Sequence, residues 1–245
     1  MATPSTITHK DREQMKAPDR FQVTAGQAAT WVQAHRKQVV FLGAAAVVVV
    51  VVATAVSTMR AQNAEAAGAA LSQAMKAMAG EISSVPLPGL PGPFYATEQA
   101  KQQAVAEAAD RVRRGWSGTA AAHTATLAFA DAKLRLGDLD GALAAYREYL
   151  VQGGPGDSLA FSAHEGIGLA EEGKGNLDAA AQAFERLARE APAYADRADL
   201  ERARVLAQAG KVDEARKILL GFADAHKESA LTGEAAERLA KLGAK

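Results

Sequence analysis

The chain has 245 residues, and its 28 Lys and Arg side chains are balanced by 28 Asp and Glu side chains. A formal charge of zero argues against a nucleic-acid-binding protein, which needs a basic excess to neutralise phosphates. Because the chain has no cysteine, disulfides, thiolate nucleophiles and cysteine-ligated zinc are excluded. Hydrophobic residues make up 49% of the chain but aromatic residues only 5%, a composition that favours closely packed helices.

An apolar segment near the N-terminus is the strongest single feature. No charged residue occurs between Lys37 and Arg60, and six consecutive valines occupy positions 47–52. At about 1.5 Å per residue this stretch gives a helix of roughly 33 Å, which matches a hydrocarbon core of about 30 Å. A helix also bonds all of its own backbone groups within lipid. The sequence therefore predicts a transmembrane helix at residues 38–59.

Two alternatives to a permanent anchor are a cleaved signal peptide and a buried core helix. The signal peptide is the stronger of the two, because Ala53, Thr54 and Ala55 fit a small-x-small cleavage pattern. However, the leader of 37 residues carries both charge signs, and the apolar run is longer than a signal-peptide core. Both features favour an anchor that is retained.

The flanking charges predict the orientation of this span. Residues 1–37 carry a net charge of +3 and the residues from Arg60 onward carry −3. Because basic residues stay in the cytoplasm, residues 1–37 are expected to be a cytoplasmic tail, with the remainder across the membrane. Within the tail, residues 24–37 fit either an interfacial helix, with Trp31 at headgroup level, or an unstructured lead-in.

A helical stalk and a linker are expected after the span. Residues 60–82 have high helix propensity and contain no proline. Leu71, Met75 and Met78 form a narrow apolar stripe that fits docking on the globular part or on a partner helix. Residues 83–96 hold four of the eight prolines, which predicts an extended spacer; a ligand for a proline-recognition domain is the alternative.

Helical periodicity persists from residue 97 to 245, and one phrase recurs there three times. It reads glycine, any residue, an apolar residue, aspartate, any residue, alanine, and it begins at Gly137, Gly175 and Gly210. The glycine would end one helix in a left-handed conformation, and the aspartate would begin the next helix at its positive end. The alanine would let two helices approach closely. An aromatic or leucine side chain follows four residues later, at Tyr146, Phe184 and Leu219.

With these residues the sequence resembles tetratricopeptide repeats. The second unit matches best, with the family's signature spacing at Gly168, Ala170, Gly175, Ala180, Phe184 and Pro192. Departures occur where the family has a large aromatic before the turn, since Lys133 and Glu171 stand there, and Lys227 replaces the closing proline of the third unit. The resemblance implies an all-α fold: a single transmembrane helix followed by a degenerate tetratricopeptide-repeat solenoid of helix-turn-helix units.

The order of parts is similar to that of the YfgM-type bacterial proteins, which are ancillary tetratricopeptide subunits of the Sec translocon. The segments P-D-R-F-Q and W-V-Q-A-H-R-K ahead of the span look like their cytoplasmic lead-in. This resemblance implies an inner-membrane protein whose repeat domain lies in the periplasm and associates with translocon subunits, periplasmic chaperones or client polypeptides. The alternative is a signal-cleaved periplasmic scaffold of cell-envelope assembly.

Repeats of this kind offer a concave surface lined by the first helix of each pair. Carrying the groove positions over from the family gives a set of mixed charge that suits a polypeptide ligand. In the three units the expected partner-binding residues are Thr124, Leu127, Asp131, Leu134 and Arg135; Ser162, Glu165, Leu169 and Glu172; and Arg197, Leu200, Arg204 and Gln208. The alternative reading of these positions is an ordinary solvated helix face.

No catalytic, cofactor or metal site is expected. The five histidines are isolated, and none stands in an H-E-x-x-H pattern. Gly166 and Gly168 superficially suggest a phosphate-binding loop, but no strand precedes them. The sequence is therefore interpreted as a protein-interaction module without enzymatic activity or cofactors, and without nucleic acid among its partners.

Overall fold

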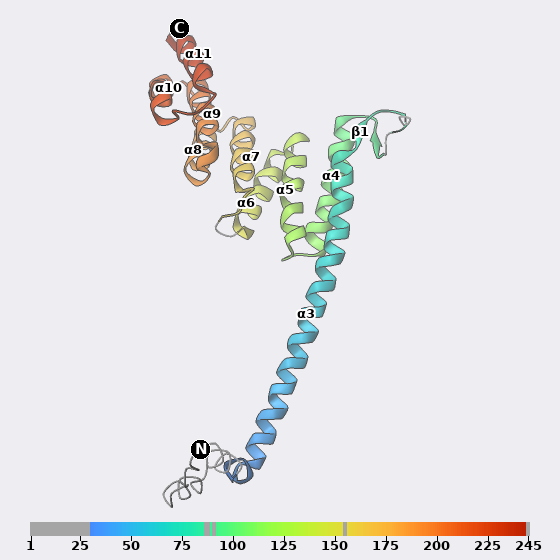
Figure 1. The fold of residues 1–245 in the computed structure, drawn as a ribbon. Coiled ribbons are helices and arrows are strands. Elements are labelled where there is room, and N and C mark those ends of the chain that lie inside the picture. The colour runs from blue at the N-terminus through green and yellow to red at the C-terminus, as the bar shows by residue number, and fades with distance from the viewer. Residues whose placement is uncertain (1–29, 86–88, 90–91, 154–155, 244–245) are drawn as a thin grey trace, which may run out of the picture. The chain divides into compact units, whose positions relative to one another are not determined.

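The computed structural model describes residues 30–85, 89, 92–153 and 156–243, which form two structural units, residues 1–60 and 61–245. The described residues are almost entirely helical, which confirms the all-α class (Figure 1). The elements in chain order are α3 (Arg36–Ala79), β1 (Glu81–Ile82), β2 (Phe94–Tyr95), α4 (Glu98–Gly115), α5 (Ala120–Arg135), α6 (Leu139–Gln152), α7 (Ala160–Gly173), α8 (Leu177–Glu190), η1 (Pro192–Tyr194), α9 (Ala195–Gln208), α10 (Val212–Ala225) and α11 (Thr232–Gly243).

The first unit contains the apolar part of α3. The predicted span lies wholly inside this helix. The most apolar 18-residue stretch of the helix has a mean hydropathy of 2.9, and none of its residues is buried. The side chains of all six valines at 47–52 are more than half exposed, unlike those of a core helix in a soluble protein. This helix is long and apolar enough to cross a membrane. The predicted tail at residues 1–29 lies outside the described residues.

The second unit begins within the same helix, because residues 61–79 of α3 pack on its own domain. Ala67 and Ala74 are fully buried, and Ala77 is nearly so. Ala74 joins a core cluster with Ala109 and Val112 of α4, among other residues. The face of α3 that packs on the domain therefore consists mainly of alanines. Of the predicted apolar stripe, Leu71 packs against this cluster, whereas Met75 and Met78 remain exposed.

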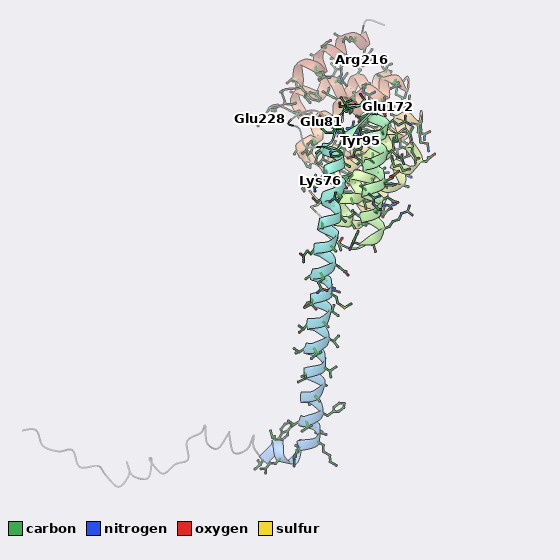
Figure 2. The ribbon with its side chains drawn as sticks, turned by 90° about the vertical axis from the view of Figure 1, so that its right-hand side faces the viewer. Lys76, Glu81, Tyr95, Glu172, Arg216 and Glu228 are labelled. Atoms are coloured by element: carbon green, nitrogen blue, oxygen red, sulfur yellow. The ribbon has the colours of Figure 1, made fainter. Side chains whose placement is uncertain are left out.

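The two ends of the proline-rich segment are paired with each other. Glu81 and Phe94 are partners in a short parallel ladder, in which the Glu81 amide donates to Pro93 O at 3.0 Å. Figure 2 labels Glu81 on β1 and Tyr95 on β2. Gly80 fits here because a Cβ at this position would lie 2.5 Å from Cε2 of Tyr95. Because of this pairing, the residues that follow the prolines lie next to the C-terminal end of α3.

Three helical hairpins follow, α5–α6, α7–α8 and α9–α10, and each turn has the geometry that the recurring phrase predicts. Gly137, Gly175 and Gly210 all have φ between 78° and 79°. At each turn the residue after the glycine donates its amide to a carbonyl five residues back, as in a Schellman motif. The aspartate lies in the first turn of the following helix in all three hairpins. The helices from α4 to α11 lie side by side in chain order (Figure 1).

Small residues at the helix crossings let these hairpins pack closely. The alanines of the three phrases, Ala142, Ala180 and Ala215, are fully buried. Gly168 lies against the ring of Phe184, so that a Cβ there would be 2.7 Å from the ring atom Cζ. Because Phe184 is itself buried, its ring has little room to move away. Gly168 is therefore explained by close packing between α7 and α8.

We expect Gly168→Ala to lower the free energy of unfolding by about 1–3 kcal/mol, the usual cost of overpacking a core. The matched control is Gly221→Ala in α10, where a new Cβ meets nothing within 4 Å. That change should leave stability unchanged or raise it by about 0.5–1 kcal/mol, because alanine is the better helix former. Urea unfolding of the full chain in detergent, followed by circular dichroism, compares the two variants. Equal losses would contradict the packing explanation.

Candidate protein-binding surface

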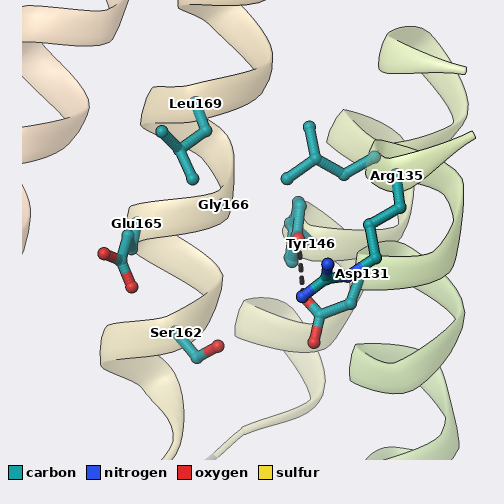
Figure 3. A pocket seen from close by; sticks show the side chains of 8 residues that line it. Asp131, Arg135, Tyr146, Ser162, Glu165, Gly166 and Leu169 are labelled. Carbon is teal, nitrogen blue, oxygen red and sulfur yellow. Dashed lines mark hydrogen bonds between the residues drawn. The ribbon is translucent and has the colours of Figure 1, made fainter. Parts of the chain in front are cut away.

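A cavity between α5 and α7 brings together residues from two consecutive hairpins. It has a volume of about 370 Å³, and we call it the α5–α7 cavity. Six of its lining residues belong to the predicted partner-binding set, and Tyr146 and Gly166 complete it (Figure 3). Its lining residues are Asp131, Leu134, Arg135, Tyr146, Ser162, Glu165, Gly166 and Leu169.

The floor of this cavity depends on Gly166. The ring of Tyr146 lies so close to the α7 backbone that a Cβ at position 166 would be 2.1 Å from its Cζ atom. From this position the Tyr146 hydroxyl donates a hydrogen bond of 2.6 Å to Oδ1 of Asp131 (Figure 3). The recurring phrase indicates Tyr146 on the helix face of its alanine but not its contact with Asp131, because Asp131 lies on the other helix of the hairpin, outside the phrase.

Burial sets the electrostatics of the cavity. It raises the pKa of Asp131, and the hydrogen bond from Tyr146 and the nearby charge of Arg135 offset this only in part. The pKa of Tyr146 is raised as well, by burial and by the carboxylate of Asp131. Among the described residues, no cationic side chain lies within ion-pairing distance of Asp131. The cavity therefore presents a desolvated carboxylate beside the exposed apolar side chain of Leu169.

Other predicted residues pair with each other between α7 and α9. Glu165 lies 2.8 Å from Nη2 of Arg197, and Glu172 lies 2.5 Å from Nη1 of Arg204. These two acids and these two arginines are each seven residues apart, which places each pair of like residues on one helix face. The hydrogen bond from Arg204 is the main reason why the pKa of Glu172 is lowered.

The ion pairs continue beyond Arg204 to α11. Arg204 also contacts Glu201 at 2.7 Å, and Glu201 in turn lies 3.3 Å from Nη2 of Arg238. Arg238 contacts Glu234 at 2.6 Å and donates to the backbone oxygen of Leu200. The charged residues from Glu172 onward thus neutralise one another across α7, α9 and α11. An open combination of apolar and charged groups remains at the α5–α7 cavity.

Seven predicted residues lie away from the cavity. Three of them, Glu172, Arg197 and Arg204, form the ion pairs described above, and two of the other four require a correction. Leu127 is 8% exposed and Leu200 only 2%, so both fill the core between helices and cannot meet a partner. Thr124 donates its hydroxyl to Ala120 O in its own helix. Gln208 is exposed at the last position of α9.

Three histidines of the domain contact carboxylates rather than one another. His123, His164 and His226 each lie 2.9 Å from one carboxylate oxygen, of Asp157, Glu190 and Asp199 respectively. Asp157 also accepts hydrogen bonds from the Tyr149 hydroxyl and the Leu159 amide. The described residues include no group of three or more histidine, aspartate or glutamate side chains that could hold a metal ion.

The raised pKa of Asp131 predicts a pH effect of definite sign. Above its ordinary value of 3.8, the unfolded chain gives up the proton more readily than the folded one, so stability is lost as the pH rises through this range. We expect Asp131→Asn, which keeps an oxygen acceptor for Tyr146, to be more stable than the natural chain at neutral pH. The advantage should shrink as the pH falls towards 4.

Asp157→Asn is the matched control with the opposite sign. Although burial acts to raise the pKa of Asp157, its hydrogen bonds outweigh burial and lower that pKa. This variant should be less stable than the natural chain at neutral pH and should approach it in acid. Chemical unfolding of the full chain across this pH range measures both. If the stability of both variants relative to the natural chain changed with pH in the same direction, the opposite pKa shifts of Asp131 and Asp157 would be refuted.

A comparison with known protein families finds a match within the helical hairpins. A family model described as Tetratricopeptide repeat matches residues 127–195, which run from α5 through α8 and η1. A comparison with curated proteins gives no match. Tetratricopeptide repeats are a fold for protein–protein interaction that is not catalytic in itself. Residues 127–195 are therefore similar to tetratricopeptide repeats, and they lie within a stack of helix-turn-helix units that runs from α5 to α10.

Proposed function

We propose that this protein is a single-pass membrane protein of the bacterial inner membrane, with a cytoplasmic N-terminus and a periplasmic repeat domain that binds polypeptide segments. The observation that carries this proposal is the α5–α7 cavity, in which six predicted contact residues from two repeats converge. Its volume of about 370 Å³ falls within the usual range of ligand pockets, about 300–1,000 Å³.

The cavity suits a peptide segment better than a small anionic ligand. Leu134 and Leu169 supply apolar walls for a side chain, whereas Asp131 and Arg135 supply both signs of charge. A polypeptide offers both kinds of group within a few residues. The mixture also fits a surface that holds different clients weakly.

Membrane attachment would make weak contacts useful. A tethered module meets partners in the same membrane at a raised effective concentration, so that modest affinities suffice. The exposed apolar helix supports the tether, and the +3 charge of residues 1–37 supports the orientation. From the order of parts we infer that the partners are subunits of the Sec translocon and periplasmic chaperones, which the protein would link. A signal-cleaved envelope scaffold is the alternative.

The absence of cysteine allows a clean test of orientation. We expect Ser117→Cys, at an exposed turn before α5, to react with a membrane-impermeant maleimide when the outer membrane alone is permeabilised. Ser5→Cys should react only after lysis of the inner membrane. The intact mass of the membrane-extracted protein should include the whole tail. Loss of about 55 N-terminal residues would favour the signal-cleaved alternative.

Site-specific photo-crosslinking tests the partners. A photoreactive residue in place of Leu169, which is 41% exposed at the cavity, should capture translocon subunits, periplasmic chaperones or their clients. The matched control replaces Leu220, an exposed leucine of α10 away from the cavity. Adducts that contain none of these proteins would refute the translocon role. The same adducts in equal yield from both positions would refute the cavity as the binding site.

A further inference from the structure

A second groove lies between α6 and α8, over α7, and we call it the α6–α8 groove. It has a volume of about 410 Å³, and its lining includes Arg147, Leu150, Val151, Ile167, Glu171 and Arg186. The α7 residues of this groove are 164, 167 and 171, whereas those of the α5–α7 cavity are 162, 165, 166 and 169. At about 100° per residue, these two sets lie on opposite sides of the helix. The groove is thus a separate surface.

The groove has an apolar wall that the fold leaves open. Val151 is 86% exposed, the highest exposure among the large apolar side chains of the second unit. Beside it, Leu150 and Ile167 are partly buried against the core of the first two hairpins. These three aliphatic side chains, from α6 and α7, line the same groove, and we call them the aliphatic strip.

Arginines stand on both rims of the strip. Arg147 of α6 lies 2.9 Å from Oε1 of Glu171, and the other oxygen of this buried carboxylate accepts from Asn176 at 2.9 Å. Glu171 is therefore already satisfied by two donors. On the opposite rim, the exposed Arg186 of α8 has no carboxylate within ion-pairing distance among the described residues. The groove carries a cation that the protein itself does not neutralise.

The equivalent groove one repeat later lacks this imbalance. It is lined by two acids and two basic residues, Asp199, Glu214, Arg202 and Lys217. Arg202 is paired there with Glu185 at 3.3 Å, and the position that corresponds to Arg186 is Gly221. The later groove also holds an exposed cation, Lys217, that has no carboxylate within ion-pairing distance among the described residues, but the two acids of its lining offset the two basic residues. An excess of positive charge is therefore found in the α6–α8 groove and not in its equivalent.

We propose that the α6–α8 groove binds an acidic, aliphatic segment of a protein partner. An aliphatic side chain would cover Val151 and Ile167, and a neighbouring carboxylate would pair with Arg186. Arg147, which is well exposed, adds positive charge on the other rim. This goes beyond the proposed function, because a client in the α5–α7 cavity and a second partner on the far side of α7 could be held together.

Three amphipathic helical peptides test the proposal on the full chain in detergent. They share leucines on one face and differ only in the flanking residue, which is glutamate, glutamine or lysine. Fluorescence anisotropy should show binding in the order glutamate, glutamine, lysine. Arg186→Glu should weaken the glutamate peptide about tenfold or more, as expected for loss of a charge-assisted contact, and should improve the lysine peptide.

Two further variants separate charge from apolar contact and from general effects. Val151→Ser should weaken all three peptides, and neither this change nor Arg186→Glu should perturb the fold, since both side chains are exposed. Lys217→Glu, which reverses a charge in the equivalent groove, should leave glutamate-peptide binding unchanged. The proposal is overturned if no peptide binds at millimolar concentration, if glutamate and glutamine peptides bind equally, or if Lys217→Glu matches Arg186→Glu.

Discussion

The close approach of neighbouring helices is the constraint on which the rest of this structure depends. Fully buried alanines at 142, 180 and 215 stand at the start of the second helix in each hairpin. Gly166 and Gly168 then admit the rings of Tyr146 and Phe184 against α7. The rings occupy the space that side chains at positions 166 and 168 would otherwise need. The position of each ring, and with it the Tyr146–Asp131 hydrogen bond, follows from this fit.

The same stacking gives α7 two sides of different character. On one side, its acids meet arginines of α9, and the surface from there to α11 is occupied by ion pairs. On this side an open cavity lies towards α5. On the other side, Glu171, which accepts hydrogen bonds from Arg147 and Asn176, lines a groove together with the aliphatic strip and Arg186. These ion pairs occupy the charged groups of the surface, and they thereby limit which parts of it remain available to a partner.

Local features of the fold could be predicted from the sequence, because each rests on a few adjacent residues. Gly137, Gly175 and Gly210 mark the turns, and the uncharged stretch after Lys37 marks the apolar helix. Features that depend on the offset between hairpins could not be predicted in the same way. The family positions predict Leu127 and Leu200 on the open face, whereas both side chains lie in the core. The alanine face of α3 and the pairing of Glu81 with Phe94 also require the tertiary arrangement.

The docking of residues 61–79 on α4 also bears on how the domain would respond to proteolysis. A cut between β1 and β2 would sever the backbone that joins α3 to the repeats. Ala74 and Ala77 would still be buried among alanines and valines of α4 and α5. The nicked halves would then be held by packing rather than by a covalent bond. Cleavage of the proline-rich segment would therefore be a poor way to release the domain, whereas cleavage in α3 before Ala61 would free it with its core complete.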